Sequence, residues 1–202
     1  MTISTEIIII RKFPYNETSL IAAGLTPEFG KITLLIKGAF RKNNSTMPVI
    51  DLFRVLEVQF KKNLQKDLYP VYSASLLRNY DNIASSLKNY NEACSICSFI
   101  FSNTHPFISV PGTFKSVCKA FESLSEAEDS SVPWYMLVKL AFLYENGFLP
   151  EIEQDASGRL ELLNAMLLAS TGFRPLPDVD DNYMKAFHGW IDNVCRYHDL
   201  KI

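Results

Sequence analysis

Basic and aromatic side chains recur along the first third of the chain in a pattern that suits binding to a nucleic-acid backbone. Lysine and arginine neutralise phosphates and release their counterions, while exposed aromatic rings stack on unpaired bases. The candidate nucleic-acid contacts are Arg11, Lys12, Lys31, Lys37, Phe40, Arg41, Lys42, Lys61 and Lys62. Tyr15 and Phe29 are further candidates for stacking. The alternative interpretation is that these cations only solubilise the edges and loops of a sheet.

Residues that could carry catalysis or hold a metal do not form a complete set. The sequence contains no P-loop, no G-x-S-x-G, no H-E-x-x-H and no dinucleotide-binding glycine fingerprint. Cys94 and Cys97 supply half of a four-ligand zinc site, so packing in a core is the preferred interpretation. His188, Cys195 and His198 can approach one another on one helix, but the spacing fixes no fourth ligand. We therefore expect no enzymatic activity, no metal and no cofactor.

The elements that would position the basic cluster are β-strands. Five segments combine β-branched and aromatic residues with turn signals between them. They are residues 6–13, 19–25, 31–37, 52–61 and 67–77. Gly30 and Gly38 bracket the third strand and are assigned structural roles, Gly30 because the turn before it needs a positive φ. Five short strands within 80 residues predict a small barrel of the OB type.

Beyond residue 80 the hydrophobic period becomes that of amphipathic helices. Helices are expected over about 83–101, 112–125, 133–146, 159–171 and 184–198. The apolar face of the first comprises Ile83, Leu87, Tyr90, Cys94, Cys97 and Phe101. The predicted fold class is therefore α+β, with an OB-fold domain over residues 1–79, the candidate nucleic-acid-binding part, and a helical domain over residues 80–202.

The charge of the chain is divided unevenly. Residues 1–80 hold 11 Lys and Arg against 6 Asp and Glu, a net charge of +5, whereas residues 81–202 carry −7. This asymmetry indicates an anionic partner for the first part but does not identify it. No apolar run approaches the roughly 18 residues that would indicate a membrane span, so we expect a cytoplasmic protein that does not enter a membrane. The four cysteines are expected to be free, buried thiols.

Three linked motifs lie within the first 41 residues: Y-x-E-x-S-L at 15–20, L-T-x-E-x-G-K at 25–31 and K-G-A-x-R at 37–41. With them, the segment from Thr5 to Ser45 resembles the N-terminal domain of the RecO family of DNA repair and recombination mediators. Weaker similarity extends to the helix around residue 144 and to the final helix. Many members of that family carry a four-cysteine zinc site just after the position of Gly147. Residues 151–158 contain no cysteine, so we expect the zinc lobe to be absent.

The resemblance implies a non-enzymatic mediator that anneals complementary strands and helps load recombinase onto single-stranded DNA coated with single-strand-binding protein. It implies three partners: single- and double-stranded DNA, RecR, and the acidic C-terminal tail of single-strand-binding protein. The tail would dock on the helical domain, beside one or more of its cations. These are Lys88, Lys115, Lys119, Lys139, Arg159, Arg174, Lys185 and Arg196. The alternative function is an OB-fold protein-interaction adaptor that has lost DNA binding.

Overall fold

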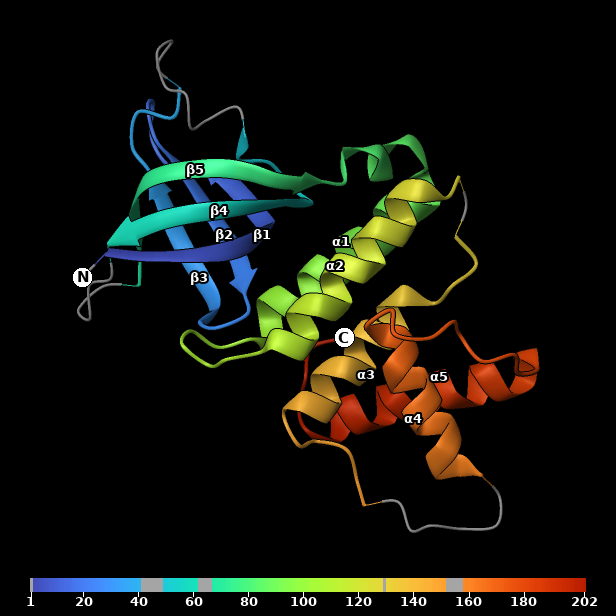
Figure 1. The fold of residues 1–202 in the computed structure, drawn as a ribbon. Helices are drawn as coiled ribbons and strands as arrows, with labels where there is room; N and C mark the ends of the chain where they lie inside the picture. The colour runs from blue at the N-terminus through green and yellow to red at the C-terminus, as the bar shows by residue number, and fades with distance from the viewer. Residues whose placement is uncertain (1, 41–48, 62–66, 129, 152–157) are drawn as a thin grey trace.

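A computed structural model describes residues 2–40, 49–61, 67–128, 130–151 and 158–202, which form a β-barrel followed by a group of helices (Figure 1). The strands are β1 (Thr2–Pro14), β2 (Leu20–Thr26), β3 (Gly30–Ile36), β4 (Arg54–Lys61) and β5 (Tyr69–Asn79). They close in the order β1-β2-β3-β5-β4, with β3 parallel to β5 and the other pairs antiparallel. The five predicted strands and the OB-type barrel are confirmed.

The run of four isoleucines in β1 supplies two separate cores. Ile7 and Ile9 point into the barrel, where Ile32 and Leu34 of β3 meet them. Ile8 and Ile10 belong instead to the core that the helices share. The pairing of β1 with β2 shifts register between Ile9 and Arg11, which is the mark of a β-bulge. A strand buried on both faces reads as a continuous apolar run, which explains this segment.

The helices are α1 (Leu87–Asn103), α2 (Pro111–Glu126), α3 (Trp134–Glu145), α4 (Arg159–Ser170) and α5 (Asp181–Tyr197). A short 3₁₀ helix, Asp81–Ser85, precedes them, and the Ser86 side chain caps α1 by accepting from the Asn89 N–H. The predicted apolar face of the first helix was therefore wrong at Leu87, which is 77% exposed, whereas Ile83 and Cys97 are buried as predicted. The break at Ser86 changes the helical phase, and Ala93, Ile96 and Ile100 are buried in addition to Cys97.

The barrel and the helices are joined by a shared core and by backbone hydrogen bonds. Ile8, Ile10 and Leu25 of the barrel pack into the same cluster as α1 and α2. The loop between α1 and α2 lies beside the β2–β3 turn (Figure 1), where the Phe107 N–H donates to the Phe29 carbonyl at 2.7 Å. Because the two parts share a core, the division of the chain into domains at residue 80 stays a prediction.

The described ranges contain neither a candidate membrane span nor a candidate metal cluster. Within them, no helix is long and apolar enough to cross a membrane. The same ranges hold no group of three or more His, Cys, Asp or Glu side chains suited to a metal ion. The four cysteines are free, three of them buried and Cys94 half-buried. Residues 152–157, part of the segment expected to lack the zinc lobe, lie outside the described residues.

Candidate nucleic-acid interface

One end of the barrel brings together residues from three segments. Phe13 lies at the end of β1 and pairs with Ile21 of β2. The Tyr15 N–H donates to the Ser19 carbonyl at 2.9 Å, and the Phe40 N–H donates to the Thr18 carbonyl at 3.4 Å. The β1–β2 turn and the segment after β3 therefore lie side by side. We call Arg11, Phe13, Tyr15, Lys37 and Phe40 the aromatic rim.

The aromatic rim exposes three large rings to solvent. Phe13, Tyr15 and Phe40 are 43%, 56% and 47% exposed. Arg11 and Lys37 are exposed beside them, and the Arg11 guanidinium lies 5.9 Å from the centre of the Phe13 ring. Exposed aromatic rings beside cations are what proteins use to hold single-stranded nucleic acid, because each base offers a face for stacking and each phosphate a charge.

The structure separates other predicted contacts from this rim. Lys12 forms an ion pair with Asp51 at 2.6 Å. The ammonium group of Lys31 donates to the Phe101 carbonyl at 2.5 Å and thereby ties β3 to α1. Burial lowers the pKa of Lys31, and the neighbouring charge of Lys201 lowers it further. Lys61 is exposed at the opposite end of the barrel, where it pairs with Thr2.

Three predicted contacts, Arg41, Lys42 and Lys62, lie outside the described residues. Gly30 and Gly38 both adopt the positive φ that favours glycine, +58° and +66°. Phe29 is half-buried and packs between Phe60 and Phe107 at ring distances of 6.5 and 6.3 Å, within the barrel and its junction with the helices.

Phe13 is a rim residue that sequence reasoning missed. Its two-residue spacing from Arg11 in a strand was the available signal, because alternate residues of a strand share a face.

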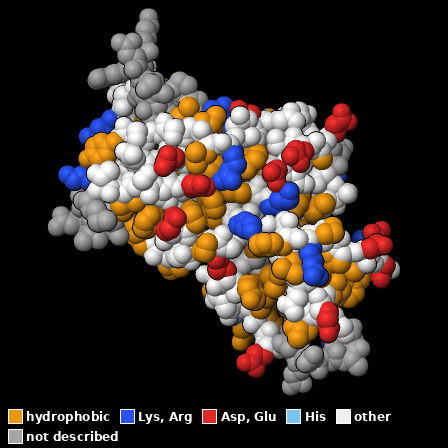
Figure 2. Space-filling model, viewed as in Figure 1, with side chains coloured by type: hydrophobic (Ala, Val, Ile, Leu, Met, Phe, Trp, Pro, Cys, Tyr) orange, Lys and Arg blue, Asp and Glu red, His pale blue; other side chains and the backbone are white. Residues whose placement is uncertain are grey.

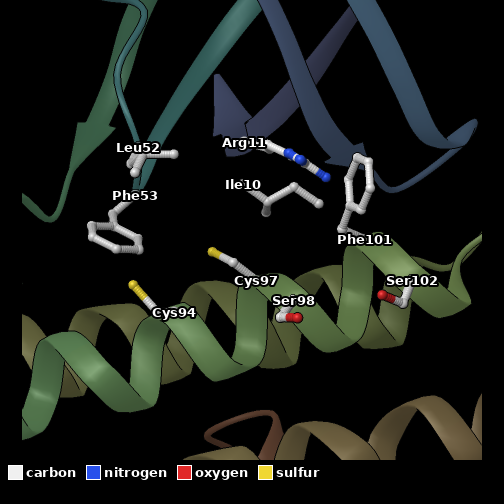
Figure 3. Close-up of a pocket in the computed structure, with 9 residues that line it drawn as sticks. All are labelled: Ile10, Arg11, Leu52, Phe53, Cys94, Cys97, Ser98, Phe101 and Ser102. Carbon is white, nitrogen blue, oxygen red and sulfur yellow. The ribbon is translucent and has the colours of Figure 1, made fainter. Parts of the chain in front are cut away.

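A pocket of about 340 Å³ opens next to the rim, between β1, the segment before β4 and α1. Its lining residues are Ile10, Arg11, Leu52, Phe53, Cys94, Cys97, Ser98, Phe101 and Ser102 (Figure 3). Arg11 extends toward the Phe101 ring, with 4.7 Å between the guanidinium carbon and the ring centre. The Cys94 and Cys97 sulfurs point from α1 toward the barrel (Figure 3).

Comparison with known proteins identifies the barrel. A family model described as "Recombination protein O N terminal" matches residues 1–80. The DNA repair protein RecO of Prosthecochloris aestuarii is 23% identical over 157 residues, which cover 76% of this chain and 58% of that protein. That of Salinibacter ruber is 22% identical over 204 residues, covering 98% of this chain and 77% of that protein. The barrel thus matches the N-terminal domain of the RecO family, and the chain as a whole is similar to proteins named DNA repair protein RecO.

The RecO match confirms the resemblance found in the motifs of the first 41 residues. The protein of Chlorobium phaeobacteroides, also named DNA repair protein RecO, is 22% identical over 161 residues. Alignment with it covers 76% of this chain and 59% of that relative. The chain thus spans less than two thirds of the length of the first relatives that it matches. The region that the RecO family model matches contains the barrel and the aromatic rim.

The helical part of the chain has an apolar groove of about 430 Å³ between α2, α3 and α4. Tyr144, Leu168 and Phe173 line it and are exposed. The Lys115 ammonium lies 3.6 Å from the centre of the Phe173 ring. The side chain of Lys119 runs past Gly172 at the end of α4. In the space-filling view, Lys and Arg side chains are interspersed with hydrophobic ones over this part of the molecule (Figure 2).

Three lysines of the helical part differ in their position relative to this groove. Lys115 and Lys119 flank it, whereas Lys139 is 1% exposed and bonded to Asp192 inside the helical domain. Lys119 also pairs with Glu122 at 2.7 Å, which partly neutralises it. Of these three lysines, Lys115 is therefore the one best placed to meet an anionic ligand in this groove.

Proposed function

We propose that this chain is a non-enzymatic RecO-type mediator of DNA repair and recombination that binds DNA through the aromatic rim. The observation that carries the proposal is the exposure of Phe13, Tyr15 and Phe40 beside Arg11 and Lys37 at one end of an OB-type barrel. The positive net charge of residues 1–80, against the negative charge of the rest, supports an anionic ligand on this part. The names of the relatives support a role in DNA repair.

The rim suits strand annealing for a physical reason. Cations hold the phosphates by charge alone, and aromatic rings accept any base, so binding is weakly selective for sequence. Few contacts would then compete with base pairing, and a second strand can pair with the bound one. In this mechanism the protein brings strands together and releases the duplex without chemical change. Recombinase loading would follow from the same hold on single strands, in cooperation with RecR and single-strand-binding protein.

The first experiment reverses two rim charges, Arg11→Glu with Lys37→Glu, and titrates a labelled single-stranded oligonucleotide over a salt series. We expect an affinity loss of about 10- to 100-fold at low salt. The slope of log K against log salt should become shallower by roughly 1.4, because each lost phosphate contact removes about 0.7. Fluorescence anisotropy measures both quantities.

Arg159→Glu with Lys185→Glu is the matched control, since it reverses the same two charge types at exposed positions of α4 and α5. Equal losses in both double variants would mean that the effect is general electrostatics and that the rim is not the site. Absence of binding by the unaltered protein, even at low salt, would contradict the proposed function and favour the protein-interaction adaptor.

We propose that the tail of single-strand-binding protein docks in the groove between α2, α3 and α4. An acidic peptide with apolar side chains needs an apolar surface beside a cation, and Leu168, Phe173 and Lys115 provide both. Leu168→Asp is expected to weaken the tail peptide by about tenfold, equivalent to 1.4 kcal/mol, because it places a like charge in the groove. Titration of a labelled tail peptide measures this.

Leu87→Asp is the control for this prediction. It makes the same substitution at an exposed leucine of α1 that does not line the groove. Unchanged peptide binding by Leu168→Asp, or equal weakening by both variants, would place the tail elsewhere. DNA binding by the Leu168→Asp protein should match that of the unaltered protein, which separates the two proposed sites.

A further inference from the structure

We infer that the pocket between β1 and α1 receives one unstacked base of the DNA strand that the aromatic rim holds. This inference rests on the proposed function, because it extends the path of the bound strand from the barrel onto the helical domain. The pocket is the one shown in Figure 3, and Ile10, Phe53, Ser98 and Phe101 are among its walls.

Arg11 connects the rim to the pocket. Its guanidinium lies 5.9 Å from the Phe13 ring, which belongs to the rim, and 4.7 Å from the Phe101 ring, which belongs to the pocket. The Lys31 ammonium lies 4.6 Å from the same Phe101 ring. A phosphate attracted to Arg11 would therefore hold a strand at the pocket mouth, where the neighbouring base can turn inward.

The chemistry of the walls matches a base better than it matches an aliphatic ligand. Phe53 and Phe101 supply aromatic surface, and the hydroxyls of Ser98 and Ser102 can each donate or accept a hydrogen bond. Arg11 is the one charged side chain among the described lining residues, so a single anionic group is accommodated at one side. Hydroxyls that serve as donor or acceptor suit the edge of any base, consistent with binding that is weakly selective for sequence.

The pocket wall at Phe53 is held in a strained conformation. Phe53 has a φ of +60°, which is unusual for a residue with a bulky side chain. Its N–H donates to the Ile9 carbonyl at 3.1 Å, and its ring meets those of Tyr90 and Phe121 edge to face at 5.8 and 5.2 Å. Strained residues that their surroundings hold in place are concentrated at ligand sites. The wall is thus formed before any ligand arrives.

Of the two pocket thiols, Cys97 forms part of the apolar wall, and Cys94 can report by its alkylation whether the pocket is occupied. Burial raises the pKa of the Cys97 thiol, so it stays protonated and contributes an apolar surface. Cys94 is half-buried, whereas Cys97, Cys118 and Cys195 are buried. Cys94 is therefore the thiol that a small alkylating reagent reaches first, and a base in the pocket would cover it.

The test measures alkylation of Cys94 by iodoacetamide, read by mass spectrometry of the digested protein. A single-stranded oligonucleotide at about four times its dissociation constant should slow the reaction roughly five-fold, because occupancy reduces the free site by 1 + [L]/Kd. An abasic oligonucleotide of the same length, at the same multiple of its own dissociation constant, should leave the rate unchanged. Anisotropy of both oligonucleotides, measured in parallel, shows that each is bound.

A pocket-filling variant provides the second readout. Ser98→Phe places a ring in the pocket from an exposed position of α1, and Ser95→Phe makes the same change at an exposed position that does not line it. We expect Ser98→Phe to abolish the quenching of a 2-aminopurine base that stacks in the pocket, while Ser95→Phe retains it.

Three outcomes would overturn the inference. Equal protection of Cys94 by both oligonucleotides would show that the strand only shields the surface. Protection by neither, with both bound, would place the strand away from the pocket. Binding of neither oligonucleotide would remove the proposed function and this inference together, so failure of the pocket alone is distinguishable.

Discussion

Gly30→Ala is expected to destabilise the protein by about 3 kcal/mol or more, because it combines backbone strain with a clash. Gly30 has a φ of +58°, and a Cβ there would lie 2.4 Å from the His105 carbonyl oxygen and 2.5 Å from that of Ile108. Both are backbone atoms, so no rotation of a side chain relieves the contact. The loop that carries them is fixed to the barrel, since the Val110 N–H donates to the Pro27 carbonyl at 2.8 Å.

Equilibrium unfolding in urea measures this loss, and Gly189→Ala is the matched control. Gly189 lies within α5, and a Cβ there meets nothing within 4 Å. Alanine at that position should be neutral or stabilise the helix by about 0.5–1 kcal/mol. A loss of less than about 1 kcal/mol in Gly30→Ala would show that the loop moves away readily and that the junction is loose.

Asp192→Ala is expected to destabilise the protein by about 3 kcal/mol, since removing one partner of a buried ion pair leaves the other charge without compensation. Lys139 of α3 is 1% exposed, and its ammonium donates to Asp192 of α5. The same ammonium lies 3.4 Å from His188 Nε2 and 4.2 Å from the centre of the Tyr135 ring. Neither neighbour can neutralise the charge that Asp192 now balances.

Lys139→Met separates two effects: loss of the Lys139–Asp192 ion pair, and burial of a lysine charge that no partner neutralises. It removes the buried cation and leaves a carboxylate that is 24% exposed and can reach water. We expect Lys139→Met with Asp192→Ala to be more stable than Asp192→Ala alone, and urea unfolding of the three variants completes the cycle. Additive losses would contradict this account.

His188 gives an independent readout of the same cluster. Burial lowers the pKa of His188, Lys139 lowers it further and Asp192 raises it. The pKa of His188 should therefore rise in Lys139→Met and fall in Asp192→Ala, as measured by NMR titration.

The sequence predicted the barrel because each strand shows its own alternation of apolar and polar residues. The alternation of Ile32, Leu34 and Ile36 determines which face of β3 is inside, and it needs no knowledge of distant residues. Lys31 shows the limit of that reasoning. Its alternation places it on the outer face of the barrel, but Phe101, 70 positions away, decides that this face meets α1. No spacing within β3 carries that information.

The predicted apolar face of the first helix was wrong in part for a related reason. Tyr90, Cys94 and Phe101 recur at a helical spacing and do share a side, but that side faces the barrel and the pocket. Ala93 and Ile96, on another side of α1, are buried in the core that includes the other helices. A helix packed on two sides has no single apolar stripe, so periodicity cannot assign its partners. The rim was found in part because charge and aromatic content are visible in sequence, whereas its assembly depends on the pairing of three strands.

The shared core has a consequence for how the chain folds as it is synthesised. Ile8, Ile10, Leu25, Phe53 and Val55 lie on the outside of the barrel and share their core with residues of the helices. The family model matches residues 1–80. When only these residues have emerged from the ribosome, the five side chains would be exposed to solvent. Their burial is complete only when both α1 and α2 have left the ribosome. The segment that the family model matches, residues 1–80, is therefore shorter than the segment that must be synthesised before the shared core can form.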